Sequence, residues 1–173
     1  MKLTIPVPAL VLLVGPSGAG KSTFAAAYFR SSEIVSSDSL REMLTDDADD
    51  QGSSAEAFHI LSLIVNGRLK RRLTTVVDAT NLRAANRKSY ARTAARYGVP
   101  AVAVAFDLGI AEYRARNAAR PDRLVGDLVV EDQAARMTDV LADLREEGHA
   151  AVYVITADQP PDSQVVRQRR GAP

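Results

Sequence analysis

Cysteine is absent from this 173-residue chain, and only two histidines occur, His59 and His149. The lack of cysteine excludes disulfides, thiolate metal sites and thiol catalysis, and it fits a reducing compartment. We therefore expect a cytoplasmic protein. The wide separation of the two histidines in the sequence disfavours a histidine metal cluster or a catalytic triad. We expect His59 to lie on the surface of a helix.

Long apolar runs and an excess of charge are also missing. No run of about 18 apolar residues is present, so no segment is expected to span a membrane. The formal net charge is +1, which gives no general attraction to nucleic acid or membranes. A site for a polyanion must therefore be a local cluster of basic residues. The apolar fraction of 46% is typical of a globular protein, and the length fits one domain.

One stretch matches the phosphate-binding template G-x-x-x-x-G-K-[ST] in full: Gly15-Pro16-Ser17-Gly18-Ala19-Gly20-Lys21-Ser22-Thr23. Glycines allow a tight turn whose backbone N–H groups converge on phosphate oxygens. Lys21 is expected to contact the β and γ phosphates, and the Ser22 hydroxyl to ligate Mg²⁺. The site therefore predicts ATP or another nucleoside triphosphate. The remaining residues expected to bind the nucleotide are Gly15, Ser17, Gly18, Ala19, Gly20 and Thr23.

Short apolar runs alternate with helical stretches along the chain. The expected strands are 9–14, 33–36, 74–78, 101–107 and 151–156, and the expected helices are 21–30, 39–44, 54–72, 84–97, 110–120 and 131–147. This alternation predicts an α/β phosphotransferase of the P-loop class, with a parallel sheet of about five strands and helices on both faces. The N-terminus, 1–14, is expected to be the first strand and not a signal peptide. We expect a kinase domain over 1–158 and a linker or flexible tail over 159–173.

Asp38 and Arg41 follow the second predicted strand. Ligands of such sheets bind at the carboxyl ends of the strands, so these residues are placed near the γ-phosphate. A carboxylate there can accept the proton of an attacking hydroxyl, and an arginine three residues on can hold an anionic group beside it. The alternative is local capping, because Ser39 and Glu42 fit a capping box.

Asp78, Thr80 and Asn81 follow the third predicted strand. An acidic residue at this position can supply a second contact to Mg²⁺, often through water. Thr80 and Asn81 are candidates for contacts to the acceptor. The alternative is an ordinary turn built from turn-forming residues.

Arg116, Arg120 and Arg123 form a third cluster. Arg116 and Arg120 share a helical face, and Pro121 and Gly126 indicate a break after that helix. Arginines on such a lid can close over a triphosphate and stabilise the charge of the transition state. The alternative is a solvated basic surface.

With these motifs in view, the chain resembles the kinase module of bacterial polynucleotide kinase-phosphatases, and more loosely the phage polynucleotide kinase. The resemblance runs along almost the whole chain, up to Thr156. It rests on the phosphate loop and on four further stretches: Val-Ser-Ser-Asp-Ser-Leu-Arg, Asp-Asp-Ala-Asp-Asp-Gln, Val-Val-Asp-Ala-Thr-Asn and Arg-Pro-Asp-Arg.

The resemblance implies roles for several residues. Asp38 would be the general base for a polynucleotide 5′-hydroxyl, and Arg41 would bridge to the acceptor end and its phosphate. Gln51 would contact the same strand. The lid arginines would lie over the donor phosphates. The longer members of the family carry further domains, so the chain is either a solitary kinase or part of a longer repair polypeptide or complex.

Three functions remain open at this point. The preferred one is Mg²⁺-dependent transfer of the γ-phosphate to the 5′-hydroxyl end of RNA or DNA in end healing and repair. The second is a kinase for a sugar, nucleoside or antibiotic hydroxyl, because Asp38 and Arg41 suit that chemistry equally. The third is a nucleotide-dependent switch that transfers no phosphate.

Overall fold

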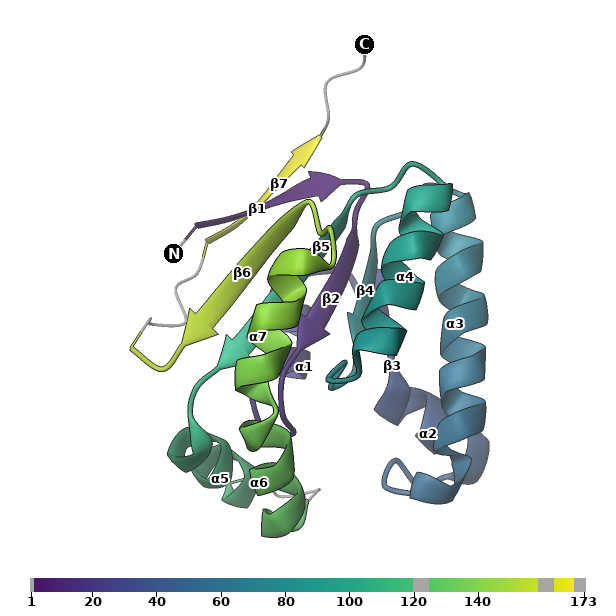
Figure 1. Ribbon diagram of the computed structural model, residues 1–173. Coiled ribbons are helices and arrows are strands. Elements are labelled where there is room, and N and C mark those ends of the chain that lie inside the picture. Colours follow the sequence, from purple (N-terminus) through teal and green to yellow (C-terminus); the bar gives the residue numbers. More distant parts are fainter. Residues whose placement is uncertain (1, 120–124, 159–163, 170–173) are drawn as a thin grey trace.

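The computed structural model describes residues 2–119, 125–158 and 164–169 (Figure 1). A parallel sheet of five strands forms its centre, in the order β3-β4-β2-β5-β6. The strands are β2 (Leu10–Val14), β3 (Ile34–Ser36), β4 (Thr75–Asp78), β5 (Ala101–Asp107) and β6 (Ala151–Thr156). The predicted α/β fold is therefore confirmed, and each strand lies within one residue of its expected bounds.

The central strand β2 shows why the sheet is covered on both faces. All five of its side chains are buried, and successive side chains point to opposite faces. Leu10, Leu12 and Val14 belong to one apolar core, and Val11 and Leu13 belong to the other. Burial on both faces accounts for the continuous apolar run in the sequence.

Helices fill the two layers. The first core packs against α3 (Ser54–Lys70), α4 (Ala84–Arg96) and α7 (Met137–Glu146), which lie together in front of the sheet (Figure 1). The second core contains residues of α1 (Lys21–Tyr28), α5 (Ile110–Ala118) and α6 (Asp127–Ala135). The helix α2 (Ser37–Thr45) follows β3, and the short 3₁₀ turns η1 (Ser31–Glu33) and η2 (Gln51–Ser53) complete the connections.

The prediction of a single helix over 131–147 is wrong. Two helices, α6 and α7, occupy this stretch, and α6 begins earlier, at Asp127. Arg136 separates them with φ −75° and ψ −14°, so the backbone stays right-handed through the break. Neither glycine nor proline is needed for such a turn, and the sequence therefore carries no signal of it.

Both ends of the chain also differ from expectation. Residues 1–14 do not form one strand, because β1 (Lys2–Val7) precedes β2 and is separated from it by a cis Val7–Pro8 peptide bond. The tail expected over 159–173 contains a strand, β7 (Gln164–Arg169), paired in parallel with β1.

Side-chain contacts explain why β7 is not a free tail. Val165 packs against the second core. Arg167 donates hydrogen bonds of 3.0 and 2.6 Å to the two carboxylate oxygens of Glu33. Burial acts to raise the pKa of Glu33, but hydrogen bonds from Arg167 and from the Arg30 backbone N–H outweigh it, so this pKa lies below its ordinary value. In the described part of the chain, no helix is long and apolar enough to cross a membrane.

Candidate active site

The phosphate loop joins β2 to α1 and is held by contacts from distant parts of the chain. Gly20 caps α1 with φ +88°, and Gly18 has φ +80°, both in the region that favours glycine. A Cβ added to Gly18 would lie 3.1 Å from the Tyr113 carbonyl oxygen, and one on Gly20 would lie 3.0 Å from the Arg116 guanidinium. The glycines therefore allow α5 to pack directly onto the loop.

Lys21 begins α1 and is only 8% exposed. Its ammonium group donates hydrogen bonds to the carbonyl oxygens of Gly15 and Pro16, at 2.9 and 2.7 Å. These contacts fold the side chain over the loop, with its charge above the turn that the glycines create. Its role beside the β and γ phosphates stays a prediction.

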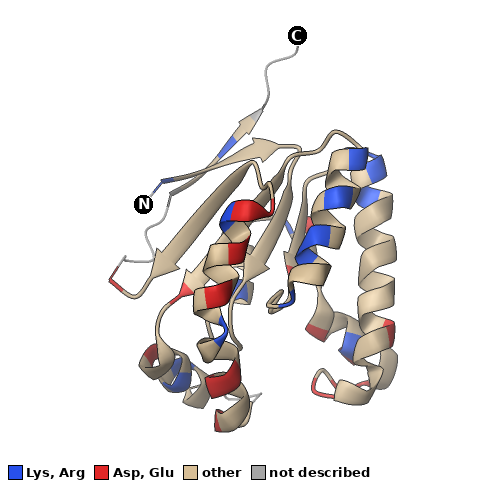
Figure 2. Cartoon of the chain, in the orientation of Figure 1, with Lys and Arg blue, Asp and Glu red and all other residues tan. Residues whose placement is uncertain are grey.

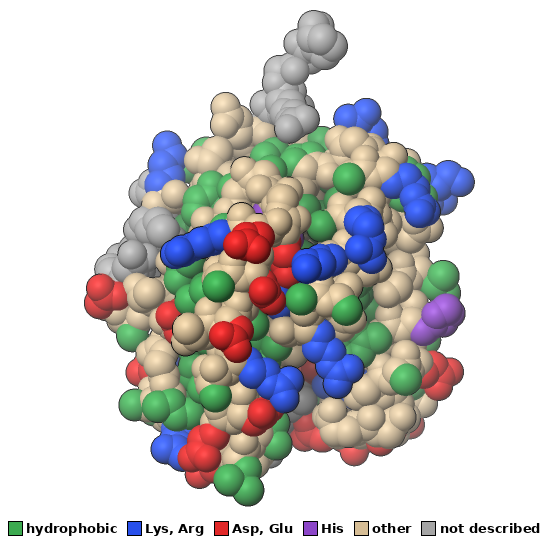
Figure 3. Space-filling view, in the orientation of Figure 1, with side chains coloured by type: hydrophobic (Ala, Val, Ile, Leu, Met, Phe, Trp, Pro, Cys, Tyr) green, Lys and Arg blue, Asp and Glu red, His purple; other side chains and the backbone are tan. Residues whose placement is uncertain are grey.

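A cleft of about 1260 Å³ opens at the carboxyl edge of the sheet. Figure 3 shows a hollow in the lower half of the front face, with basic side chains above it and acidic side chains below it. The cleft brings together the predicted residues Ser17, Gly18, Ala19, Gly20, Lys21, Ser22, Thr23, Asp38, Arg41, Gln51, Asp78, Thr80, Asn81 and Arg116. Residues from five separate stretches of sequence thus share one space.

The oxygen ligands in this cleft suit Mg²⁺. Ser22 offers a hydroxyl and Asp78 a carboxylate, and both line the same space. Mg²⁺ usually keeps several waters and takes one or two protein oxygens together with substrate phosphates. No group of three His, Asp or Glu side chains that could hold a metal occurs among the described residues. Ser22 and Asp78 therefore fit a nucleotide-bound Mg²⁺.

Asp38 and Arg41 form an ion pair on the side of the cleft where the sequence predicts the acceptor. Arg41 is 5% exposed and Asp38 is 40% exposed, so the arginine is anchored and the carboxylate reaches into the cleft. Arg41 Nε donates to the Ala48 carbonyl oxygen at 2.7 Å. Burial lowers the pKa of Arg41, against the opposing effect of Asp49 and Asp50.

The capping alternative for this segment is wrong in its detail. The helix α2 begins at Ser37, and Ser36 is its N-cap, whose hydroxyl accepts the Ser39 backbone N–H at 3.4 Å. Ser39 therefore lies inside the helix and does not cap it. Asp38 sits in the first turn, where its charge also favours the helix.

The turn after β4, which also lines the cleft, is fixed by hydrogen bonds to the main chain. Asn81 is buried with φ +51°, and its amide donates to the Leu13 carbonyl oxygen at 2.7 Å, which ties the end of β4 to that of β2. The Thr80 carbonyl oxygen accepts the Gly15 N–H at 3.0 Å. Asn81 thus has a structural role that the sequence does not indicate, because its partners are main-chain atoms of a neighbouring strand.

A buried ion pair supports this turn from behind. Arg87 of α4 has no exposed surface, and it donates to the carbonyl oxygens of Asn81 and Leu82 at 3.0 and 2.9 Å. It also donates to both carboxylate oxygens of Glu147, at 2.7 to 3.2 Å. Figure 2 shows the wider pattern: the charged residues of α4 are basic, and those of α7 are mainly acidic.

The predicted lid is described only in part. Arg116 of α5 lines the cleft, donates to Glu112 at 2.6 Å and lies 3.5 Å from the Ala19 carbonyl oxygen. Arg120 and Arg123 lie outside the described residues. Gln51, expected to meet the acceptor, is exposed and lines the cleft, with its amide 3.3 Å from the Asp49 carbonyl oxygen.

Comparison with known proteins identifies the family. Residues 10–144 match the sequence profile of an AAA domain family, AAA_33. The chain belongs to this family. No curated protein gave a significant match to the sequence.

Solved structures show how widely the fold of this AAA domain is shared. A chain of the Pnkp1/Rnl/Hen1 RNA repair complex superposes with a TM-score of 0.67 and 23% identity, over 80% of this chain and 46% of that one. A chain of the PezAT toxin-antitoxin system of Streptococcus pneumoniae gives 0.69 and 18%, over 91% and 70%. A gluconokinase from Sinorhizobium meliloti gives 0.56 and 19%, over 90% and 86%.

These likenesses support a kinase-type P-loop fold for this AAA domain. The chain spans about half the length of the repair-complex chain that it matches.

The sequence did not indicate three further residues of the AAA domain's cleft. Gln133 of α6 accepts the Ser17 backbone N–H at 2.7 Å, which links α6 to the phosphate loop. Arg136 and Arg83 also line the cleft. Arg136 sits at the unforeseen break between α6 and α7. Arg83 lies in an ordinary turn before a helix. Neither arginine belongs to a local sequence motif.

Proposed function

We propose that this chain is a polynucleotide 5′-hydroxyl kinase, which transfers the γ-phosphate of a nucleoside triphosphate to the 5′ end of RNA or DNA. The observation that carries the proposal is that Asp38 and Lys21 line one cleft, so that a candidate base and the phosphate loop share one space. The resemblance of the motifs around Asp38 and Asp78 to the polynucleotide kinase family supplies the acceptor. It also supports a place in a longer repair polypeptide or complex.

The transfer step follows from these positions. Asp38 accepts the proton of the 5′-hydroxyl as its oxygen forms a bond to the γ-phosphorus. The bond from that phosphorus to the β–γ bridging oxygen breaks, and the nucleoside diphosphate leaves. Arg41 holds Asp38 in place through their ion pair.

The donor phosphates are held from the other side. Backbone N–H groups of the loop and the Lys21 ammonium bind the β and γ phosphates. Ser22 and Asp78 are the residues that would hold Mg²⁺, which neutralises charge on these phosphates when bound. Arg116, with Arg120 and Arg123, would cover the triphosphate as a lid, so Arg120→Ala or Arg123→Ala should lower turnover.

A transfer assay tests the proposal directly. The protein, Mg²⁺ and γ-labelled ATP are mixed with a 5′-hydroxyl oligonucleotide and, in parallel, with the same strand already 5′-phosphorylated. We expect label only on the hydroxyl strand. Label on neither strand, with ATP still bound, would overturn the proposed function.

A second function, a kinase for a small hydroxyl compound, is favoured by one observation. The loop beside Arg41 contains Asp46, Asp47, Asp49 and Asp50, and such a surface repels a polyanion. A gluconokinase is among the proteins of similar fold. Acceptor competition separates the two functions, because a free nucleoside or sugar that accepts phosphate as well as an oligonucleotide end would favour the second. A nucleotide switch would be indifferent to Asp38→Ala.

A further inference from the structure

Four arginines line the cleft, and three of them already have carboxylate partners. Arg41 pairs with Asp38, and Arg116 pairs with Glu112. Arg136 pairs with Asp132 at 2.7 Å. The fourth is Arg83, whose side chain makes no hydrogen bond or ion pair within the described part of the chain. Its guanidinium can take an external anion without giving up an internal partner.

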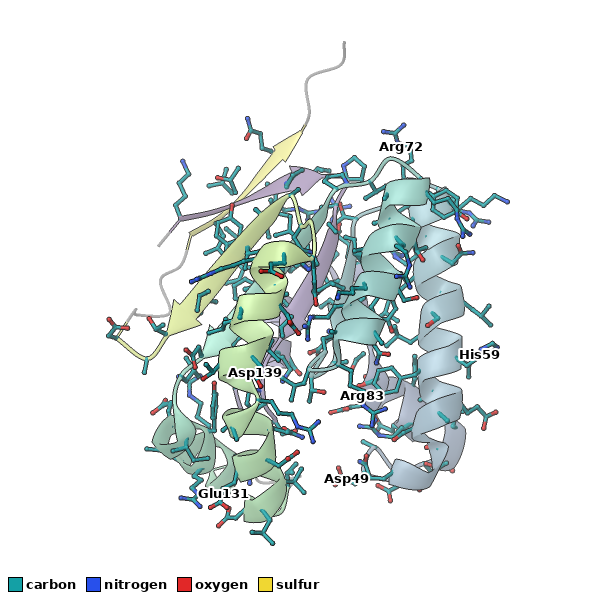
Figure 4. The ribbon with its side chains drawn as sticks, in the orientation of Figure 1. Asp49, His59, Arg72, Arg83, Glu131 and Asp139 are labelled. Carbon is teal, nitrogen blue, oxygen red and sulfur yellow. The ribbon has the colours of Figure 1, made fainter. Side chains whose placement is uncertain are left out.

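The backbone of Arg83 is held in place while its side chain is exposed. Arg83 is the N-cap of α4, and its carbonyl oxygen accepts the backbone N–H groups of Asn86 and Arg87 at 3.1 and 3.3 Å. Below it, Arg87 fixes the carbonyl oxygens of Asn81 and Leu82. In Figure 4, Arg83 lies at the end of α4 that faces the opening, above Asp49.

The topology places Arg83 on the acceptor side. Asp38 follows β3, and Arg83 lies in the turn that follows β4, which is the neighbouring strand in the sheet. Carboxyl ends of neighbouring parallel strands meet at one edge, so the two turns lie side by side. Thr80 and Asn86 line the cleft on either side of Arg83 in the sequence.

On the side of the cleft that carries Asp38, nearby carboxylates offset the charge of Arg41, so a polyanionic acceptor would need a further positive charge. The charge of Arg41 is compensated by Asp38, and Asp49 and Asp50 also act on it. A polyanionic strand that passes the acidic loop would meet little positive charge from Arg41 alone. Arg83 supplies a positive charge on this side without an internal carboxylate partner.

We propose that Arg83 binds a backbone phosphate of the acceptor strand beyond the first one, on the 3′ side of the second nucleotide. This inference rests on the proposed function and adds an acceptor subsite to it. A phosphate contact carries no base information, so the subsite favours longer strands without reading their sequence. A single contact of this kind is consistent with the near-neutral charge of the chain.

The experiment compares two acceptors and four proteins. The acceptors are a nucleoside 3′-monophosphate and a 5′-hydroxyl hexanucleotide, and the proteins are wild type, Arg83→Ala, Arg83→Lys and the control Arg92→Ala. Arg92 is exposed on the same helix and does not line the cleft. The initial rate is measured over a range of acceptor concentrations and at several salt concentrations.

We expect Arg83→Ala to raise the KM for the hexanucleotide about tenfold, the effect of losing one charge-assisted hydrogen bond, with kcat unchanged. The KM for the monophosphate should stay within about twofold, because we expect Arg41 to bind its phosphate. The salt dependence of log(1/KM) should lose about 0.7 in slope, the value for one phosphate of a single strand. Arg83→Lys should restore most of the affinity, and Arg92→Ala should match wild type.

The possible failures are distinguishable. If wild type phosphorylates the hexanucleotide and Arg83→Ala behaves like Arg92→Ala, the Arg83 subsite is wrong while the proposed function stands. Equal losses on both acceptors would also overturn the subsite, because Arg83 would then act at the reacting end. If wild type phosphorylates neither acceptor, the proposed function fails and the subsite fails with it.

Discussion

The donor and acceptor sides of the cleft are built in different ways. The proposed donor side is the phosphate loop, whose main chain is held by the rest of the protein: the Ser17 and Gly15 N–H groups donate to Gln133 and to the Thr80 carbonyl oxygen, and Lys21 is folded onto loop carbonyl oxygens. The acceptor side is made of side chains that project from short elements, such as Asp38 and Arg83. A tight glycine turn that binds phosphate through its main chain tolerates few substitutions. Projecting side chains, by contrast, can be exchanged without changing the fold.

The largest expected effect tests whether the acceptor side does chemistry. Asp38→Ala should lower turnover by about 10² to 10⁴, the usual contribution of a general base, while nucleotide binding survives. Single-turnover transfer and nucleotide titration measure the two quantities separately. Asp38→Asn is the matched variant, because it keeps the shape and removes the base. Transfer at the wild-type rate in either variant would remove Asp38 from the mechanism.

The next effect concerns the support of the acceptor turn. Arg87→Met should lower the free energy of unfolding by about 3 to 5 kcal/mol, because it removes the arginine charge from the buried Glu147 carboxylate, which then keeps only its 3.2 Å contact with His149. Urea unfolding measures this change. The double variant Arg87→Met with Glu147→Leu should recover most of the loss. A single variant as stable as wild type would show that the turn is held by other contacts.

The same pair predicts how stability depends on pH. Burial acts to raise the pKa of Glu147, but hydrogen bonds from Arg87 outweigh it, so this pKa lies below its ordinary value. The pair therefore contributes its stability fully above the unfolded pKa of about 4.3 and loses it as pH falls through the lowered pKa. Urea midpoints between pH 6 and 3 should fall more steeply for wild type than for the Arg87→Met variant. Parallel curves would contradict this prediction.

The smallest effect tests the link between α6 and the phosphate loop. Gln133→Ala removes the acceptor of the Ser17 backbone N–H, a hydrogen bond worth about 1 kcal/mol. Hydrogen exchange at the Ser17 amide should become about fivefold faster. Gln133→Glu keeps an oxygen acceptor and should leave the exchange rate near that of wild type. If both variants exchange like wild type, α6 does not restrain the loop.

The same contrast between the two sides explains which parts of the site the sequence could predict. The phosphate loop was predicted residue by residue, because consecutive glycines, Lys21 and Ser22 act through local backbone geometry. Asp38 and Arg41 could also be predicted, since a helical spacing of three places them together. Gln133 and Arg87 could not, because each meets its partner across more than 50 residues of sequence. The strand β7 was missed for the same reason, since its pairing partner β1 lies at the other end of the chain.

The sequence by itself determined the parallel α/β fold, the position of the phosphate loop and the candidate groups at the ends of β3 and β4. It did so because apolar runs and glycine turns are encoded over short distances, where period and spacing can be read directly. The tertiary structure alone decided that Asn81 ties two strands together, that Arg87 supports the acceptor turn and that Arg83 faces the cleft with no carboxylate partner among the described residues. These facts depend on which charges the fold brings together, and charge pairing across distant segments leaves no local pattern in a sequence.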